Sequence, residues 1–341
     1  MPIFTLSMVG NMQTSDAGPD ETMRLAVERF RAKMESSNRR FLQDRIDEIE
    51  AMGLATEEEK LDKMSLYWPG LGKKMGRWND IVPPGPVQQN RETSNVTRLE
   101  DVNSTFHQYM DGIIPSTLVT EEWREMYLEV IQSVCNKAAI QDNEDKDEDF
   151  QVPKCVELGN FIKYANGVQD PDFRCSGICP FHPIFSFIGV KSYAFPDHPA
   201  VLALPTPNIS KSREILKDYL EDYILDEDFI QGIVDEDLEV KVGFETGLGC
   251  RHEHDEWRSA YLYCRSDDEA AITLKEWAWR VVVFHADGEN PATLYGRQPR
   301  FDSIPEFLDW YSSWLDYVDM DEVRRAVLGL EGDEDGHESE E

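Results

Sequence analysis

The sequence has no long apolar stretch. Nowhere does it approach the roughly 18 uninterrupted apolar residues that a membrane-spanning helix needs. The N-terminal segment MPIFTLSMVGNM lacks a basic residue and is too short and mixed in character for a signal peptide. We therefore expect a chain that has no membrane partner and that resides in the cytoplasm or the nucleus.

Positive charge is also scarce. The chain has 34 Lys and Arg residues against 67 Asp and Glu residues, which gives a formal charge of −33. Part of the excess lies in 142–149, expected to be an acidic linker, and in 329–341, expected to be a disordered acidic tail. Phosphate backbones bind to clustered Lys and Arg, so this charge argues against nucleic acid as a partner. A protein partner, including a basic one, is compatible with it.

Cysteine is sparse, with six residues in 341. Without a secretory segment, this number predicts reduced thiols. Two short clusters nevertheless contain thiolate and imidazole groups, the ligands that zinc prefers. They supply six candidate metal ligands: Cys175, Cys179, His182, Cys250, His252 and His254. Their spacing matches no standard zinc pattern, so buried thiols and surface histidines, with no cofactor, are the alternative to a zinc-stabilised or hydrolytic domain built on 175–182 and 250–254.

The first half of the chain is rich in helical patterns. After an irregular start at 1–19, apolar residues at three- and four-residue spacing predict a helix over 20–51 that ends at Gly53. This helix is expected to pack along the domain, with a coiled-coil dimer as the alternative. Thr56 and Glu59 form a capping box for a second helix that reaches about residue 67.

The helical region is expected to extend over 20–141. Gly, Pro and Asn residues dominate 68–105, which predicts a loop-dominated connection. Thr120 then has the position of an N-cap for another amphipathic helix.

The second half, 150–328, changes character. A short helix over 156–165 is expected to end in a left-handed cap at Asn166-Gly167, and Ser210 is expected to cap a further helix. Four segments have the composition of strands: 184–190, 200–205, 261–264 and 279–284. A closing helix lies within 301–318, and either Asp302 or Ser303 can cap it. Helices followed by strands and flanking helices predict an α+β fold with a mainly antiparallel sheet.

Two segments of this second half resemble the SUKH superfamily, which includes fungal cell-wall-synthesis regulators and bacterial toxin-immunity proteins. One is the helix that ends in Tyr164-Ala165-Asn166-Gly167, and the other is the ending WRVVVF…FDSIPEFLDW. The resemblance covers about 153–318 and requires an insertion around 205–260. It implies an α+β domain without catalytic residues, whose partners are proteins.

Aromatic residues on the closing helix are the candidate contacts for such a partner. Core packing is expected for most of them, and any that remain exposed would serve as binding anchors, because Trp and Tyr dominate interface hot spots. The candidates are Trp310, Tyr311, Trp314 and Tyr317. The sequence therefore predicts a non-enzymatic protein–protein interaction module, an adaptor or regulator, with the zinc or hydrolytic domain as the alternative.

Overall fold

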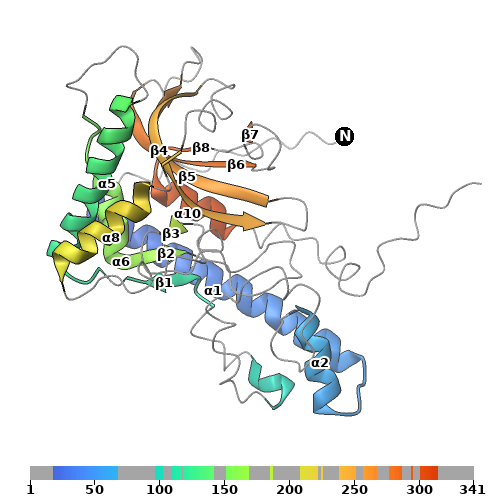
Figure 1. The fold of residues 1–341 in the computed structure, drawn as a ribbon. Coiled ribbons are helices and arrows are strands. Elements are labelled where there is room, and N and C mark those ends of the chain that lie inside the picture. Colours follow the sequence, from blue (N-terminus) through green and yellow to red (C-terminus); the bar gives the residue numbers. More distant parts are fainter. Residues whose placement is uncertain are drawn as a thin grey trace, which may run out of the picture.

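The computed structural model combines helices with two antiparallel sheets (Figure 1), which confirms the α+β class. No helix in the part of the chain that it describes is long and apolar enough to cross a membrane. The described residues are 18–67, 97–102, 110–116, 118–141, 151–168, 185–186, 208–221, 224–225, 238–250, 256–266, 276–285, 293–294 and 300–313.

The larger sheet has five strands. β4 (Leu238–Cys250) pairs with β5 (Glu256–Ser266), and β5 pairs with β6 (Ala278–His285). The other edge of β6 pairs with two short strands, β7 (Thr293–Leu294) and β8 (Arg300–Phe301). The predicted strands at 261–264 and 279–284 are confirmed within β5 and β6.

The smaller sheet has the order β1-β2-β3, formed by β1 (Ile113–Pro115), β2 (Ala165–Val168) and β3 (Phe185–Ser186). β3 falls within the strand predicted at 184–190, whereas 200–205 lies outside the described residues.

The short helix at the start of the second half is confirmed as α6 (Val156–Tyr164), but the predicted cap is wrong. Ala165 is extended, with φ −149°, and the chain continues directly into β2. Asn166 and Gly167 are therefore buried residues of β2, and neither forms a left-handed turn. Gly167 pairs with Ile114 and Ser186, and Asn166 lies at a register shift between β1 and β2.

The helices lie on one side of the larger sheet (Figure 1). They include α1 (Pro19–Ala51), α5 (Glu121–Gln141), α8 (Ile209–Glu221) and α10 (Ile304–Ser312). Residues from these helices, from α6 and from one face of the sheet form a single hydrophobic cluster, the main core. The N-terminal helical region and the later α+β region therefore share one core, and α1 packs along the domain as expected.

The opposite face of the larger sheet is apolar as well. Its residues form a second-face cluster: Leu225, Leu238, Ala260, Leu262, Cys264, Val282 and Phe284. Along β6, for example, Val281 and Val283 belong to the main core while Val282 and Phe284 belong to the second-face cluster. Successive side chains of a strand point to opposite faces. A strand whose residues are nearly all apolar therefore indicates a sheet that is buried on both faces.

Beyond the main core, α1 continues and α2 (Glu57–Tyr67) packs against its far end (Figure 1). The turn between them follows the sequence prediction. Gly53 has φ +65°, where glycine is favoured because a Cβ would be strained. The capping box is present: the Thr56 N–H donates to the Glu59 carboxylate, 3.0 Å, and the Glu59 N–H donates to the Thr56 hydroxyl, 3.2 Å.

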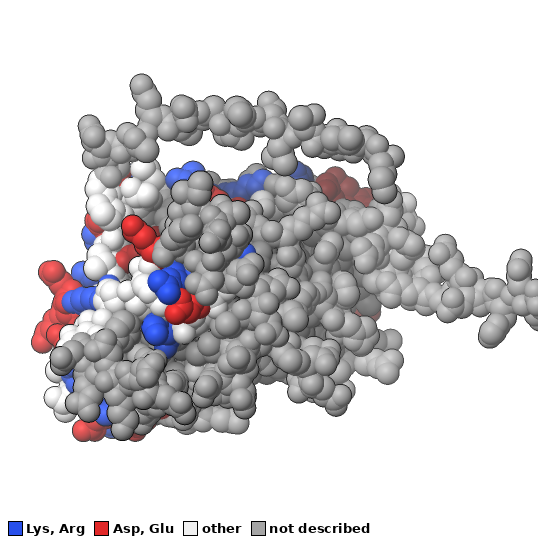
Figure 2. All heavy atoms as spheres, turned by 90° about the horizontal axis from the view of Figure 1, so that it is seen from above, with Lys and Arg blue, Asp and Glu red and all other residues white. Residues whose placement is uncertain are grey.

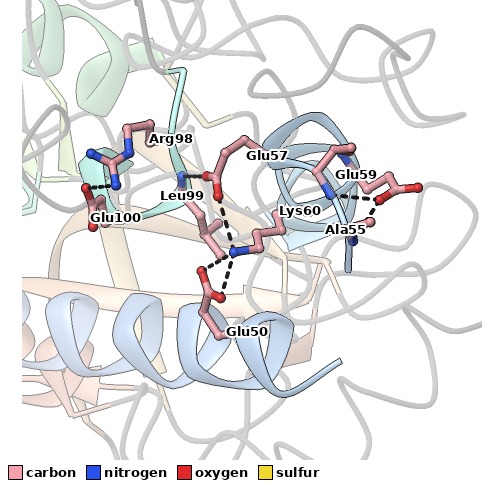
Figure 3. A network of polar contacts seen from close by, with 9 residues as sticks. Glu50, Ala55, Glu57, Glu59, Lys60, Arg98, Leu99 and Glu100 are labelled. Carbon is pink, nitrogen blue, oxygen red and sulfur yellow. Dashed lines mark hydrogen bonds and ion pairs between the residues drawn. The ribbon is translucent and has the colours of Figure 1, made fainter. Parts of the chain in front are cut away.

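A small polar network joins α1, α2 and the 3-10 turn η3 (Leu99–Asp101) (Figure 3). The Lys60 ammonium contacts Glu50 at 2.7 Å and Glu57 at 3.2 Å. Glu57 in turn accepts a hydrogen bond from the Leu99 N–H at 2.9 Å. These contacts raise the pKa of Lys60 and lower the pKa of Glu57. Part of the predicted loop is thus an ordered turn, in which Leu99 is fully buried.

The sequence predicted the cap of α5 correctly and the cap of α8 incorrectly. Thr120 accepts a hydrogen bond from the Trp123 N–H at 3.4 Å, as expected. At α8 the prediction of Ser210 is wrong: the Asn208 side chain accepts from the Lys211 N–H at 3.2 Å, and Ser210 lies inside the helix.

Two ion pairs link α5 to α8, Lys137–Glu221 at 3.0 Å and Arg213–Glu129 at 2.8 Å. On the face shown in Figure 2, the described Lys and Arg side chains also lie beside Asp and Glu side chains. Pairing within the molecule therefore neutralises many of the described cations.

Candidate protein-interaction surface

A β-bulge in β4 shapes one end of the larger sheet. Val240 pairs with Cys264 and Val242 pairs with Tyr263, so Lys241 is an extra residue opposite a single position of β5. A bulge shifts the alternation of side chains between the two faces of a sheet. Accordingly, Val240 packs against the second-face cluster, Val242 belongs to the main core, and the Lys241 side chain reaches the aromatic residues described next.

Four aromatic rings from β5, from β6 and from the residue just before β6 form a continuous row, the aromatic strip. It consists of Tyr261, Trp279, Tyr263 and Trp277. The ring centroids of Tyr261 and Trp279 are 5.1 Å apart, those of Trp279 and Tyr263 are 5.6 Å apart, and those of Tyr263 and Trp277 are 5.5 Å apart. Contacts at these distances stabilise aromatic pairs beyond the area that they bury.

The aromatic strip runs from the core to the surface. Tyr261 is 1% exposed and Tyr263 is 8% exposed, whereas Trp277 and Trp279 are only partly buried at the rim of the main core. The Trp279 indole N–H donates to the Pro153 carbonyl at 2.8 Å, which fixes the strip against the segment before α6. Burial raises the pKa of Tyr263, so its ring stays neutral and apolar in character.

Two cations lie over the outer ring of the strip. The Lys241 ammonium is 5.5 Å and the Arg265 guanidinium 5.1 Å from the centroid of Trp277. Arg265 also forms an ion pair with Glu239, its direct cross-strand neighbour. Cation–π contacts of this kind hold a tryptophan in one orientation at a surface. The arrangement is therefore a fixed, partly exposed aromatic side chain framed by charges of both signs.

Sequence analysis missed this surface, although a signal for it was present. The alternation Trp277-Ala-Trp279 before the apolar run of β6 places both tryptophans on one face of a strand. The bulge that brings Lys241 to them has no comparable signal in the sequence.

The predicted binding anchors on α10 lie mainly in or at the core. Tyr311 is 2% exposed and its ring stacks on Phe30 at 5.8 Å, so it packs inside the protein and is removed from the set of surface anchors. Trp310 is partly buried against Phe301, with a centroid distance of 5.2 Å. Because it is only partly buried, part of its side chain stays accessible to a partner. Trp314 and Tyr317 lie outside the described residues.

The two predicted metal clusters are largely outside the described residues. Only Cys250 is described, as a backbone position at the end of β4. Within the described ranges no group of three or more Cys, His, Asp and Glu side chains could hold a metal ion. The zinc site at Cys175, Cys179, His182, Cys250, His252 and His254 thus remains a prediction, which elemental mass spectrometry on protein purified without a histidine tag or chelators would decide.

The described thiols are core residues. Cys135, Cys155 and Cys264 are buried. Burial raises the pKa of Cys135 to about 12 and that of Cys264 to about 11. Because the thiolate is the reactive form of cysteine, these side chains serve packing and not nucleophilic chemistry at neutral pH.

Comparison of the chain with protein-family models, with curated proteins and with solved structures found no match.

Proposed function

We propose that this protein is a non-enzymatic protein–protein interaction module, and that the outer end of the aromatic strip is its contact surface. The observation that carries the proposal is Trp277, a partly buried tryptophan held by Tyr263 and by two cations. Interface hot spots are enriched in Trp, Tyr and Arg, and they bind best where the side chain is already oriented before the partner arrives. This module is the function that the SUKH resemblance implies as well.

The charge of the chain indicates the kind of partner. The charge of −33 favours the approach of a basic protein, because long-range attraction raises the rate of encounter. At the strip itself, Glu239 and the exposed Glu276 offset Lys241 and Arg265. Affinity at this surface would therefore come mainly from the buried area of Trp277, and charge would set orientation and rate.

Replacing Trp277 by alanine is expected to abolish most partner binding. Loss of a central hot-spot tryptophan costs about 2 kcal/mol or more, which corresponds to a decrease in affinity of roughly 30-fold. The measurement is quantitative affinity capture of basic proteins by the wild-type chain and by Trp277→Ala. Binding of each captured protein is then remeasured with purified components at several salt concentrations.

Trp123→Ala is the matched control. Trp123 is also a partly buried tryptophan at the rim of the main core, but it lies on α5 and is not one of the four rings of the strip. Circular dichroism and thermal unfolding establish that both variants are folded. A set of partners that is unchanged by Trp277→Ala, or lost equally in both folded variants, would contradict the proposal.

A further inference from the structure

Arg280 is a buried cation on the second face of the larger sheet. It is 3% exposed. Side chains alternate along β6, so Arg280 points away from the face of Trp279 and toward the face of Val282, a member of the second-face cluster. Its direct partner on β5, Leu262, belongs to the same cluster. A guanidinium at such a place needs protein acceptors, because burial removes the water that would otherwise accept from its N–H groups.

Three acceptors bind the Arg280 guanidinium. Its Nε donates to the Asp302 carboxylate at 2.8 Å, and its Nη1 donates to the backbone carbonyls of Cys264, at 2.6 Å, and Glu276, at 3.1 Å. Asp302 lies between β8 and α10, and its side chain is 43% exposed. Hydrogen bonds from a charged donor are stronger than those between neutral groups. Arg280 therefore ties together β5, the segment before β6 and the segment before α10.

Both carbonyl groups lie beside the outer end of the aromatic strip. The Glu276 carbonyl belongs to the peptide group that precedes Trp277. The Cys264 carbonyl belongs to the peptide group that precedes Arg265, the cation over the Trp277 ring. Arg280 thus holds the backbone on both sides of this cation–π contact.

Strand pairing stops just short of this contact. The last pair between β5 and β6 in the described part of the chain is Cys264 with Ala278. Trp277 precedes β6, so it lies one residue beyond the ladder. The bonds from Arg280 to the Cys264 and Glu276 carbonyls join the two segments at the point where their pairing ends.

We propose that Arg280 is a positioning residue for Trp277. From the second face of the sheet its guanidinium holds the backbone at Glu276 and Cys264, so that the Trp277 ring keeps one orientation against Tyr263 and the two cations. The consequence for binding rests on the proposed function, in which a ring oriented in advance is the partner contact. Because Arg280 is buried on the opposite face, it acts on the partner only through Trp277.

Fluorine NMR of the full chain labelled with fluorotryptophan tests the positioning without a partner. The resonances of Trp277 and Trp279 are assigned by their loss in Trp277→Phe and Trp279→Phe. In Arg280→Met, which has no donor, the Trp277 resonance is expected to narrow and to shift toward its position in the unfolded chain, because the ring gains motion. The Trp279 resonance should stay unchanged, since Trp279 lies within the ladder and its indole N–H donates to the Pro153 carbonyl.

Arg280→Lys is the second variant, because it keeps the charge beside Asp302 and is the less disruptive of the two. Its donors radiate from a single nitrogen and do not reproduce the planar guanidinium, so the Trp277 resonance should change in the same direction. Circular dichroism and thermal unfolding establish which variants are folded. A Trp277 resonance that is unchanged in a folded variant, or that changes no more than the Trp279 resonance, would overturn the positioning role.

Affinity for a basic protein captured by the wild-type chain is the second readout. If the Trp277 ring divides among about three side-chain rotamers, the binding-competent fraction falls to about one third, and Arg280→Met should bind about threefold more weakly. Adding Arg280→Met to Trp277→Ala should cause no further loss, and an equal loss in that background would refute the inference. Binding that is unchanged by Trp277→Ala would instead refute the proposed function, while the fluorine resonances would still decide whether Arg280 positions the ring.

Discussion

Replacing Phe30 by alanine is expected to lower the free energy of unfolding by about 3–5 kcal/mol, the usual cost of removing a fully buried phenylalanine. Phe30 is 0% exposed, lies in the main core and stacks on Tyr311 of α10 with centroids 5.8 Å apart. The substitution removes this contact between the first and last described helices and leaves a cavity that the packed neighbours fill only in part. Denaturant unfolding, followed by circular dichroism and tryptophan fluorescence, measures the effect.

Arg29→Ala is the matched control, one residue away and directed at the same helix. Arg29 pairs with Asp309 at 3.1 Å, but the two side chains are 56% and 53% exposed. Exposed pairs of this kind contribute less than about 1 kcal/mol, so the loss should be small. If Phe30→Ala were as mild as Arg29→Ala, or if the two probes gave separate transitions, α1 would not belong to the same cooperative unit as the sheet.

Gly243→Ala is expected to destabilise the protein by about 2–3 kcal/mol through overpacking. A Cβ at this position of β4 would lie 2.1 Å from Leu262 Cδ2 and 3.1 Å from the Tyr261 carbonyl oxygen. Leu262 pairs directly with Gly243 and is itself fully buried in the second-face cluster, so it has little room to move aside. The small gain from restricting the unfolded chain does not offset this clash.

A double-mutant cycle separates the clash from other effects of alanine. Leu262→Ala alone should cost about 2–5 kcal/mol, because it opens a cavity. When Gly243→Ala is added to it, the new methyl group occupies part of the vacated space, so the pair should lose at least about 1 kcal/mol less than the sum of the single variants. Additive losses would show that the contact with Leu262 is not the cause.

Local signals in the sequence were sufficient to predict most of the helices. The three- and four-residue spacing of apolar side chains predicted α1, the Thr56–Glu59 box predicted the start of α2, and Ser303, one of the two predicted caps, begins α10. Each of these features depends on residues within a few positions of one another. At α8 the same reasoning predicted Ser210, whereas the cap is Asn208, two residues earlier. Both residue types are favoured N-caps, so local composition does not rank them.

There is a physical reason why the sequence did not predict β4, the longest of the described strands. β4 contains Gly243, Gly247 and Gly249 and has two register shifts, one after Val240 and one after Glu245. Glycine weakens strand propensity, and each bulge resets the alternation of apolar residues. The periodicity of two that identifies a strand is therefore absent from β4, and pairing with β5 decides its conformation.

The sequence by itself determined the acidic charge, the α+β class and the positions of the amphipathic helices, because composition and short-range periodicity are properties of the chain alone. Only the tertiary structure decided the candidate site. Trp277, just before β6, meets Lys241 through the bulge in β4, with Tyr263 of β5 stacked beside it. This surface depends on residues that are far apart in the chain, and it exists only after folding.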